Sequence, residues 1–204
     1  MNETQTVPHR LVVGISGASG TIYGIRLLQV LHAMPDVQSH LLLSEPARVI
    51  MQQETNWEPA AVEALADIVY APDEMGAAIA SGSFRTLGMV IIPCSIKTLS
   101  AVAHSYAANL MARAADVTLK EGRPLLLVVR ETPLHLGHLR LMQQVAEMGG
   151  VVFPPVPALY ARPQTLDDIV DGTVGRILAR LGIENELYFR WTGLGDGGLY
   201  EGGH

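Results

Sequence analysis

The stretch LVVGISGASGTIYG, residues 11–24, passes from an apolar run through a turn of glycines and hydroxyls directly into a helical pattern. An apolar run of this length is typical of a buried strand, and a helix that begins directly after it is typical of a βα unit. Short apolar runs and helical patterns alternate along the rest of the sequence as well. This first unit therefore indicates how the remaining chain is built.

Five apolar runs predict strands, over residues 11–15, 40–43, 89–93, 125–129 and 151–153. Six patterns predict helices, over residues 22–34, 46–54, 60–66, 108–121, 137–148 and 166–181. The last helix begins after Thr165, has Asp168 in a capping-box-like position and ends at Gly182. Because strands that are apolar throughout are covered on both faces, we expect an α/β fold with a doubly wound parallel sheet.

Length and composition indicate one well-buried core. The chain has 204 residues, of which 49% are hydrophobic and only 17% are charged. We expect a single domain over residues 1–191 and a flexible glycine-rich tail over residues 192–204. The low charge and a mean hydropathy of +0.25 favour burial of surface in a homo-oligomer.

Charge and cysteine usage exclude several classes of protein. A net charge of −6 leaves no broad basic surface for nucleic acid. The single Cys94 excludes an internal disulfide framework and a multi-cysteine metal site, and it fits a reducing compartment. The polar N-terminus is unlike a signal peptide, and no apolar run approaches the ~20 residues of a membrane span. We expect a soluble, cytoplasmic protein.

Ligands of doubly wound sheets bind beyond the carboxyl ends of the strands, so the strand-end loops are the place to look for a site. The first loop has three evenly spaced glycines: Gly14, Gly17 and Gly20. Their spacing matches neither the G-x-G-x-x-G dinucleotide fingerprint nor a P-loop. Backbone amides at a helix start, with hydroxyls of Ser16 and Ser19, favour a phosphate or a flavin edge, and a tight turn with capping serines is the alternative.

The other loops leave alternatives open. Ser44 stands where NAD-binding folds have an acid for the ribose, which argues against NAD; it is either a helix cap or a ligand contact. Cys94 lies between Pro93 and Ser95 without a visible His partner, which favours packing over catalysis. Six cations either converge on a phosphate or are surface charges: Arg113, Lys120, Arg123, Arg130, Arg162 and Arg176.

Glu54 and Glu131 are each a candidate general acid or base, or a surface residue. His135 and His138 have a spacing that a metal site can use, but the sequence offers no third ligand, so a structural pair is favoured.

Five motifs, read in order, resemble the UbiX-type flavin prenyltransferases, a family once regarded as aromatic-acid decarboxylases. The motifs span residues 11–183 and are GISGASGTIYG, ASGSFRT, IIPCSIKTLSAVA, NLMARAADVTLKEGRPLLLVVRETPLHLGHLRLM and PPVPALYARPQTLDDIVDGTVGRIL. The resemblance implies a flavodoxin/Rossmann-like three-layer sandwich that assembles into a homododecamer with FMN at the subunit interface. It also implies transfer of a dimethylallyl group from dimethylallyl monophosphate to N5 and C6 of reduced FMN, without metal, giving prenylated FMN for UbiD-type decarboxylases.

The resemblance also implies roles for individual residues. The FMN contacts it implies are Gly17, Ala18, Ser19, Ser44, Ser95, Ile96, Lys97, Thr98 and Arg130. The prenyl-donor contacts it implies are Ser81, Arg113, Lys120, Glu131, Tyr160 and Arg176. The catalytic residues it implies are Ser19, Glu54, Lys120 and Glu131. These types suit the chemistry, because cations stabilise a departing phosphate and a carboxylate accepts a ring proton.

Two departures from the family pattern concern the flavin phosphate and the prenyl donor, respectively. Glu45 stands where the family often has Lys, and the stretch DEMGAAIA, residues 73–80, lacks the tryptophan that some members place near the prenyl group. The sequence leaves monophosphate and diphosphate donors open, as well as the client decarboxylase. Two other functions remain alternatives: a flavin-dependent cysteine-peptide decarboxylase and a subunit that only carries FMN. The first lacks a recognisable catalytic His and Asn-containing loop here, and the second would not need the implied catalytic set.

Overall fold

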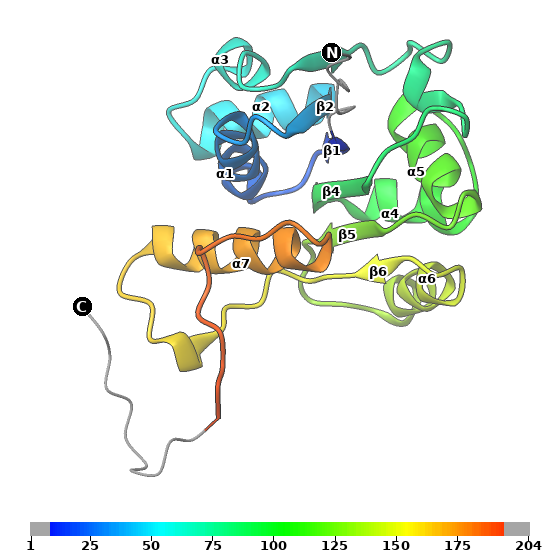
Figure 1. Ribbon diagram of the computed structural model, residues 1–204. Coiled ribbons are helices and arrows are strands. Elements are labelled where there is room, and N and C mark those ends of the chain that lie inside the picture. The colour runs from blue at the N-terminus through cyan, green and yellow to red at the C-terminus, as the bar shows by residue number, and fades with distance from the viewer. Residues whose placement is uncertain (1–8, 194–204) are drawn as a thin grey trace. The chain divides into compact units, whose positions relative to one another are not determined.

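The computed structural model describes residues 9–193, which form two compact units, residues 9–156 and 157–193 (Figure 1). Most of the expected tail, residues 194–204, lies outside the described residues. The expectation of a single domain over residues 1–191 stays a prediction. Within residues 9–193, no helix is both long and apolar enough to cross a membrane.

The first unit is built on a sheet of six parallel strands: β1 (His9–Ile15), β2 (Val37–Leu43), β3 (Ile68–Tyr70), β4 (Gly88–Cys94), β5 (Leu125–Val129) and β6 (Val151–Val152). Their order is β3-β2-β1-β4-β5-β6, so the direction of winding reverses between β1 and β4. Such a reversal opens a crevice at the carboxyl ends of these two strands. The doubly wound α/β prediction is confirmed.

Six α-helices of the first unit cover this sheet: α1 (Thr21–His32), α2 (Glu45–Glu54), α3 (Pro59–Glu63), α4 (Ile96–Ala103), α5 (Leu110–Lys120) and α6 (Leu136–Glu147). Figure 1 shows α1 and α2 on one side of the sheet and α4, α5 and α6 on the other, which gives three layers. Every residue of β4 and β5 is buried, as strands covered on both faces must be.

Two elements of this unit differ from the prediction. β3 is an extra strand of three residues, too short to show a period of two in the sequence. The loop predicted after β4 is instead α4, which begins at Ile96 after the cap Ser95. The hydroxyl residues and Lys97 of α4 make its sequence look like a loop. The helix nevertheless has an apolar face, whose buried residues are Leu99, Val102 and Ala103.

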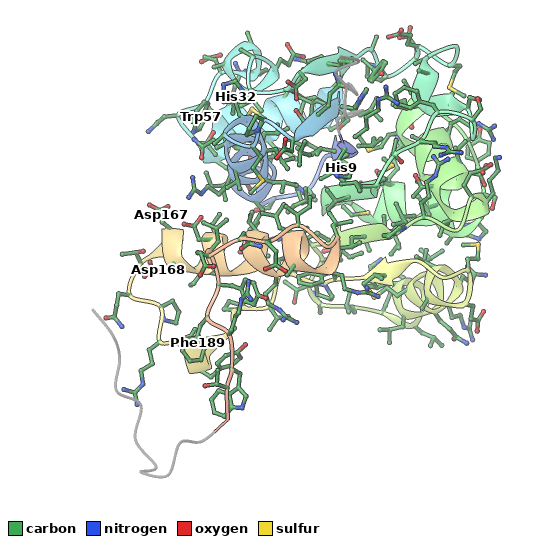
Figure 2. All side chains as sticks on the ribbon, in the orientation of Figure 1. His9, His32, Trp57, Asp167, Asp168 and Phe189 are labelled. Atoms are coloured by element: carbon green, nitrogen blue, oxygen red, sulfur yellow. The ribbon has the colours of Figure 1, made fainter. Side chains whose placement is uncertain are left out.

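The second unit contains η2 (Leu159–Ala161), a single 3-10 turn, and α7 (Leu166–Arg180). The capping box of α7 is present as predicted: Thr165 accepts the Asp168 N–H, and Asp168 accepts the Thr165 N–H. Figure 2 shows Asp167 and Asp168 together in the first turn of α7, where carboxylates favour the helix dipole. The side-chain amide of Asn185 donates to Gly175 O at 3.0 Å, so this hydrogen bond holds the segment that follows α7 against the helix.

His40 is a histidine sealed inside the first unit. It is fully buried in β2, where its Nδ1 lies 2.9 Å from the Tyr70 hydroxyl. Its ring stacks on Tyr70 and meets the edge of Phe84. Burial lowers the pKa of His40 to about 4; the charge of Arg10 also lowers this pKa, while Asp67 opposes the shift. His40 is therefore neutral in the folded protein at pH 7.

We expect His40 to make the free energy of unfolding fall as the pH drops from about 6.5 to about 4. In this window the histidine takes up a proton in the unfolded chain but not in the folded one, so acid favours unfolding by at most about 1.4 kcal/mol per pH unit. Urea denaturation at several pH values checks this. His40→Gln should show a shallower dependence, and a slope equal to that of the wild type would contradict the role of His40.

Candidate functional site

Backbone hydrogen bonds join the loops that follow four neighbouring strands. The Ser44 N–H donates to Ile15 O at 3.1 Å, and the Ser16 N–H donates to Pro93 O at 3.2 Å. The Arg130 N–H donates to Cys94 O, also at 3.2 Å. These bonds join the loops after β1, β2, β4 and β5 along the side of the sheet where the strands have their carboxyl ends, which we call the carboxyl edge. That edge carries all nine residues for which FMN contact is predicted: Gly17, Ala18, Ser19, Ser44, Ser95, Ile96, Lys97, Thr98 and Arg130.

Glu54 caps the N-terminus of α1, although it lies at the end of α2. Its Oε2 accepts the Gly20 N–H at 2.8 Å and the Thr21 N–H at 3.4 Å. The hydroxyls of Ser19 and Thr21 hydrogen-bond to the same carboxylate. The sequence favours a phosphate or a flavin edge here, but the anion at this helix terminus is the chain's own carboxylate. A flavin edge is the ligand that remains compatible, because a phosphate would have to displace Glu54.

The hydrogen bonds at Glu54 set its charge. Partial burial alone would raise the pKa of this carboxyl, but the bonds from Ser19, Gly20 and Thr21 outweigh burial and lower the pKa below its ordinary value. The side chain is therefore an anion at neutral pH, and it is exposed to solvent rather than sealed in the core. A charged carboxylate next to a hydroxyl is equipped to move a proton.

Gly17 brings the first loop against the start of α2. A Cβ at this position would lie 2.4 Å from the Cβ of Pro46, so only glycine permits this approach. Ser44 caps α2 by accepting the Ala47 N–H, and Ser95 caps α4 by accepting the Thr98 N–H. Three helix N-termini thus face one edge, and their first-turn amides lack intrahelical acceptors. Ser44 is a helix cap, and its contact with a ligand stays a prediction.

The structure assigns packing roles to two polar residues of this edge. The Cys94 thiol is fully buried and lies 3.6 Å from Ser95 O, and burial raises its pKa. It is packed, as the sequence favours. The Ser16 hydroxyl, counted above among the ligand donors, instead donates to Pro93 O at 3.0 Å. That interpretation of Ser16 is wrong, because its proton is already used inside the protein.

Three predicted donor-side residues form a second group along α5. Arg113 Nε donates to Ala80 O at 3.3 Å, and Lys120 Nζ pairs with the Glu121 carboxylate. The Ser81 hydroxyl lies 2.9 Å from that of Ser83. The sequence does not single out Arg123 as the residue that holds this loop. Its guanidinium donates to the carbonyls of Gly82 and Phe84, at 2.6 and 2.8 Å. No short motif marks this role, since the bonds join segments about 40 positions apart.

Lys120 and Glu131 lie at opposite ends of β5. Lys120 ends α5 just before β5, whereas Arg130 and Glu131 follow β5 directly. The five residues of β5 span about 16 Å at the rise of a parallel strand. Within one chain, Lys120 and Glu131 are therefore separated by about the length of β5.

The remaining predicted donor contacts, Tyr160 and Arg176, belong to the second unit. The Tyr160 ring meets Phe189 and Trp191 edge to face, with centroids 6.1 and 5.8 Å away. Figure 2 shows Phe189 beside η2, which carries Tyr160. The Arg176 guanidinium lies 5.4 Å from the Tyr188 ring. Phe189 and Trp191 were not predicted as site residues, since they follow the last motif.

A hollow of about 420 Å³ lies along the outer face of α4. Its lining residues are Lys97, Ser100, Ala101, His104, Tyr106 and Ala108.

The rings of His135 and His138 lie 3.6 Å apart, and His135 caps α6 by accepting the Gly137 N–H. Within residues 9–193, no three His, Cys, Asp or Glu side chains gather as a metal site would require.

Comparison with known proteins gives consistent matches. The family model described as Flavoprotein matches residues 1–178. Flavin prenyltransferase UbiX of Escherichia coli (strain K12) is 58% identical over 186 residues, which cover 90% of this chain and 98% of that protein. Among solved structures, the dodecameric FMN-dependent UbiX-like decarboxylase from Escherichia coli O157:H7 has a TM-score of 0.88 at 47% identity, with 90% of this chain and 100% of that chain covered.

A second solved structure is AnUbiX (PadA1) in complex with FMN and dimethylallyl pyrophosphate. Its TM-score is 0.89 at 43% identity, with 92% of this chain and 99% of that chain covered. The resemblance drawn from the five motifs is thereby confirmed over nearly the whole chain. The protein belongs to the flavoprotein family and, within it, to the UbiX flavin prenyltransferases.

Proposed function

We propose that this protein joins a dimethylallyl group, taken from dimethylallyl monophosphate, to N5 and C6 of reduced FMN. The product is prenylated FMN, which serves a UbiD-type decarboxylase. The observation that carries the proposal is the ionised Glu54 held beside Ser19 at the edge where the flavin-contact loops meet. A protein that only carried FMN would not need a poised carboxylate there.

The carboxyl edge fits FMN. Gly17 lets the first loop pack closely against the start of α2, and the first turns of α2 and α4 supply amides for the phosphate. The residues that would hold FMN are Gly17, Ala18, Ser19, Ser44, Ser95, Ile96, Lys97, Thr98 and Arg130. Reduced FMN supplies nucleophilic N5 and C6. The C–O bond of the donor would break, the dimethylallyl group would replace the N5 proton, and that proton would leave with the phosphate, so the flavin would gain one C5H8 unit.

Glu54 and Ser19 manage the proton transfers. One proton must reach the alkene carbon of the prenyl group and another must leave ring carbon C6, so no net proton is consumed in ring closure. The Ser19 hydroxyl donates to Glu54. The lowered pKa of Glu54 keeps its carboxylate ionised, so that it has a free site for a proton. This pair therefore relays protons along one short path.

Cations and aromatics on the donor side stabilise the departing phosphate and the allyl cation. Lys120 and Arg113 suit the first task, together with Arg176. Tyr160 suits the second, and its packing against Phe189 and Trp191 supplies aromatic surface that residues 73–80 lack. Glu45 lies 3.2 Å from Arg48 Nε, but Arg48 also pairs with Glu63, so these three side chains keep one net negative charge at the start of α2.

Neighbouring copies complete the site. Lys120 and Glu131 lie at opposite ends of β5, so they can serve one donor only if they come from different chains. A dodecameric relative supports such sharing, and we infer the same assembly here. We place the enzyme in the cytoplasm, where its one cysteine, Cys94, stays reduced.

The test is an anaerobic incubation of the purified oligomer with FMN, dithionite and dimethylallyl monophosphate. We expect the flavin mass to rise by one C5H8 unit. Flavin that binds but keeps its mass would identify a carrier instead. A parallel reaction with dimethylallyl diphosphate separates the donors: mass gain with the diphosphate alone would replace the proposed donor by that one.

A further inference from the structure

Ser16 joins two loops of the carboxyl edge through its side chain. The residue follows β1 and is 1% exposed. Its hydroxyl donates to Pro93 O at 3.0 Å and accepts the Ser95 N–H at 2.8 Å. One hydroxyl group therefore donates one hydrogen bond and accepts another between the loop after β1 and the loop after β4, next to the backbone bond from the Ser16 N–H to Pro93 O.

Several other links between these loops run between backbone atoms, as from the Ser44 N–H to Ile15 O, from the Arg130 N–H to Cys94 O and from the Ser16 N–H itself to Pro93 O. Substitution of a side chain leaves such bonds in place. The hydroxyl bonds of Ser16 differ, because a single substitution removes them. They also act directly on Ser95, whose own hydroxyl caps α4 through the Thr98 N–H. The Ser16 hydroxyl is thus bonded directly to the residue that caps α4.

We propose that Ser16 is a positioning residue for FMN: it sets the spacing between the turn of residues 17–19 and the turn of residues 95–98 without touching the flavin. This inference rests on the proposed function, since both turns are assigned to FMN there. The Ser16 hydroxyl is unavailable to a ligand, because its proton points to Pro93 O, its oxygen accepts from Ser95 and the side chain is buried.

Substitutions at Ser16 change the two bonds in graded steps. Alanine removes both and leaves the Ser95 N–H and one lone pair of Pro93 O without their partner. Cysteine keeps the shape but forms weaker hydrogen bonds. Threonine keeps the hydroxyl and adds a methyl group. If the hydroxyl controls the spacing of the turns, affinity for FMN should increase from the alanine variant through the cysteine variant to the threonine variant.

Ser39 provides a matched control. It is also a fully buried serine whose hydroxyl bonds both ways: it donates to Asp67 Oδ2 at 2.9 Å and accepts the Asp67 N–H at 3.1 Å. Ser39 pairs with Leu11 in the amino half of the sheet, away from the carboxyl edge. Ser39→Ala should therefore cost similar stability and leave the flavin site intact.

The experiment measures the dissociation constant of FMN by flavin fluorescence and the thermal midpoint, both on the intact oligomer. Ser16→Ala should raise the dissociation constant about tenfold, Ser16→Cys should fall between alanine and wild type, and Ser16→Thr should stay within about threefold of wild type. Ser39→Ala should lower the thermal midpoint comparably and leave the dissociation constant within about twofold of wild type. If Ser16→Ala does not fold, Ser16→Cys and Ser16→Thr carry the comparison.

An unchanged dissociation constant in Ser16→Ala or Ser16→Cys would overturn the proposal. Equal losses of affinity in Ser16→Ala and Ser39→Ala would also overturn it, because they would reflect general destabilisation. A wild-type protein that binds FMN but never increases its mass would refute the proposed function, while the affinity series would still support or overturn the role of Ser16.

Discussion

Glu54→Gln is expected to slow the formation of prenylated FMN by about 100-fold or more, while FMN binding stays near the wild-type level. Glutamine keeps an oxygen that accepts the Gly20 N–H, so the start of α1 retains its cap. It has no carboxylate, and so it takes no proton from Ser19. Loss of rate without loss of binding is the signature of a proton-transfer group.

Single-turnover kinetics with mass detection of the flavin measure this effect. Glu58→Gln is the matched control, since Glu58 is an exposed carboxylate nearby in sequence that accepts the Gln52 amide at 2.9 Å. It should leave the rate unchanged. A Glu54→Gln protein that forms product at the wild-type rate would remove Glu54 from the mechanism.

Lys120→Ala and Glu131→Gln should each lower activity by about 100-fold or more, yet regain part of it when the two variants are assembled together. The two residues lie at opposite ends of β5 in one chain. A shared site therefore takes Lys120 from one chain and Glu131 from its neighbour. Mixed oligomers therefore contain some sites with both native residues. The same variants kept apart contain none.

Co-expression with two different affinity tags isolates the mixed oligomers for assay. The control combines Lys120→Ala with a chain that carries both substitutions, because no site in that mixture holds both residues. Recovery in the test mixture alone supports sharing. Recovery in neither mixture would mean that Lys120 and Glu131 act within one chain or on different steps.

The sequence predicts the fold well where the signal is local. Buried parallel strands such as β4 are apolar throughout, and the capping box of α7 is readable as Thr165 with Asp168. The sequence fails at β3, which is too short for a period, and at α4, whose polar residues suggest a loop. Both errors arise because tertiary burial decides the conformation of short segments.

The sequence proposes a set of site residues, which stays a prediction, but it does not give their arrangement. Motif order suggests Lys120 and Glu131, only 11 positions apart, and does not indicate that β5 separates them. Likewise, Glu54 as the cap of α1 and Ser16 as a link to Ser95 depend on contacts between residues 34 and 79 positions apart. Such contacts follow from strand order, which no single loop encodes.

If neighbouring copies share the donor site as proposed, the separation of Lys120 from Glu131 also couples donor binding to assembly. A ligand held by groups from two chains binds the assembled form better than the free chain, so by mass action the prenyl donor would favour the oligomer, and dilution would favour its release. Concentration of the protein then acts as a control on affinity. With part of the proposed site at each end of β5, occupancy of the donor site would depend on the abundance of the protein.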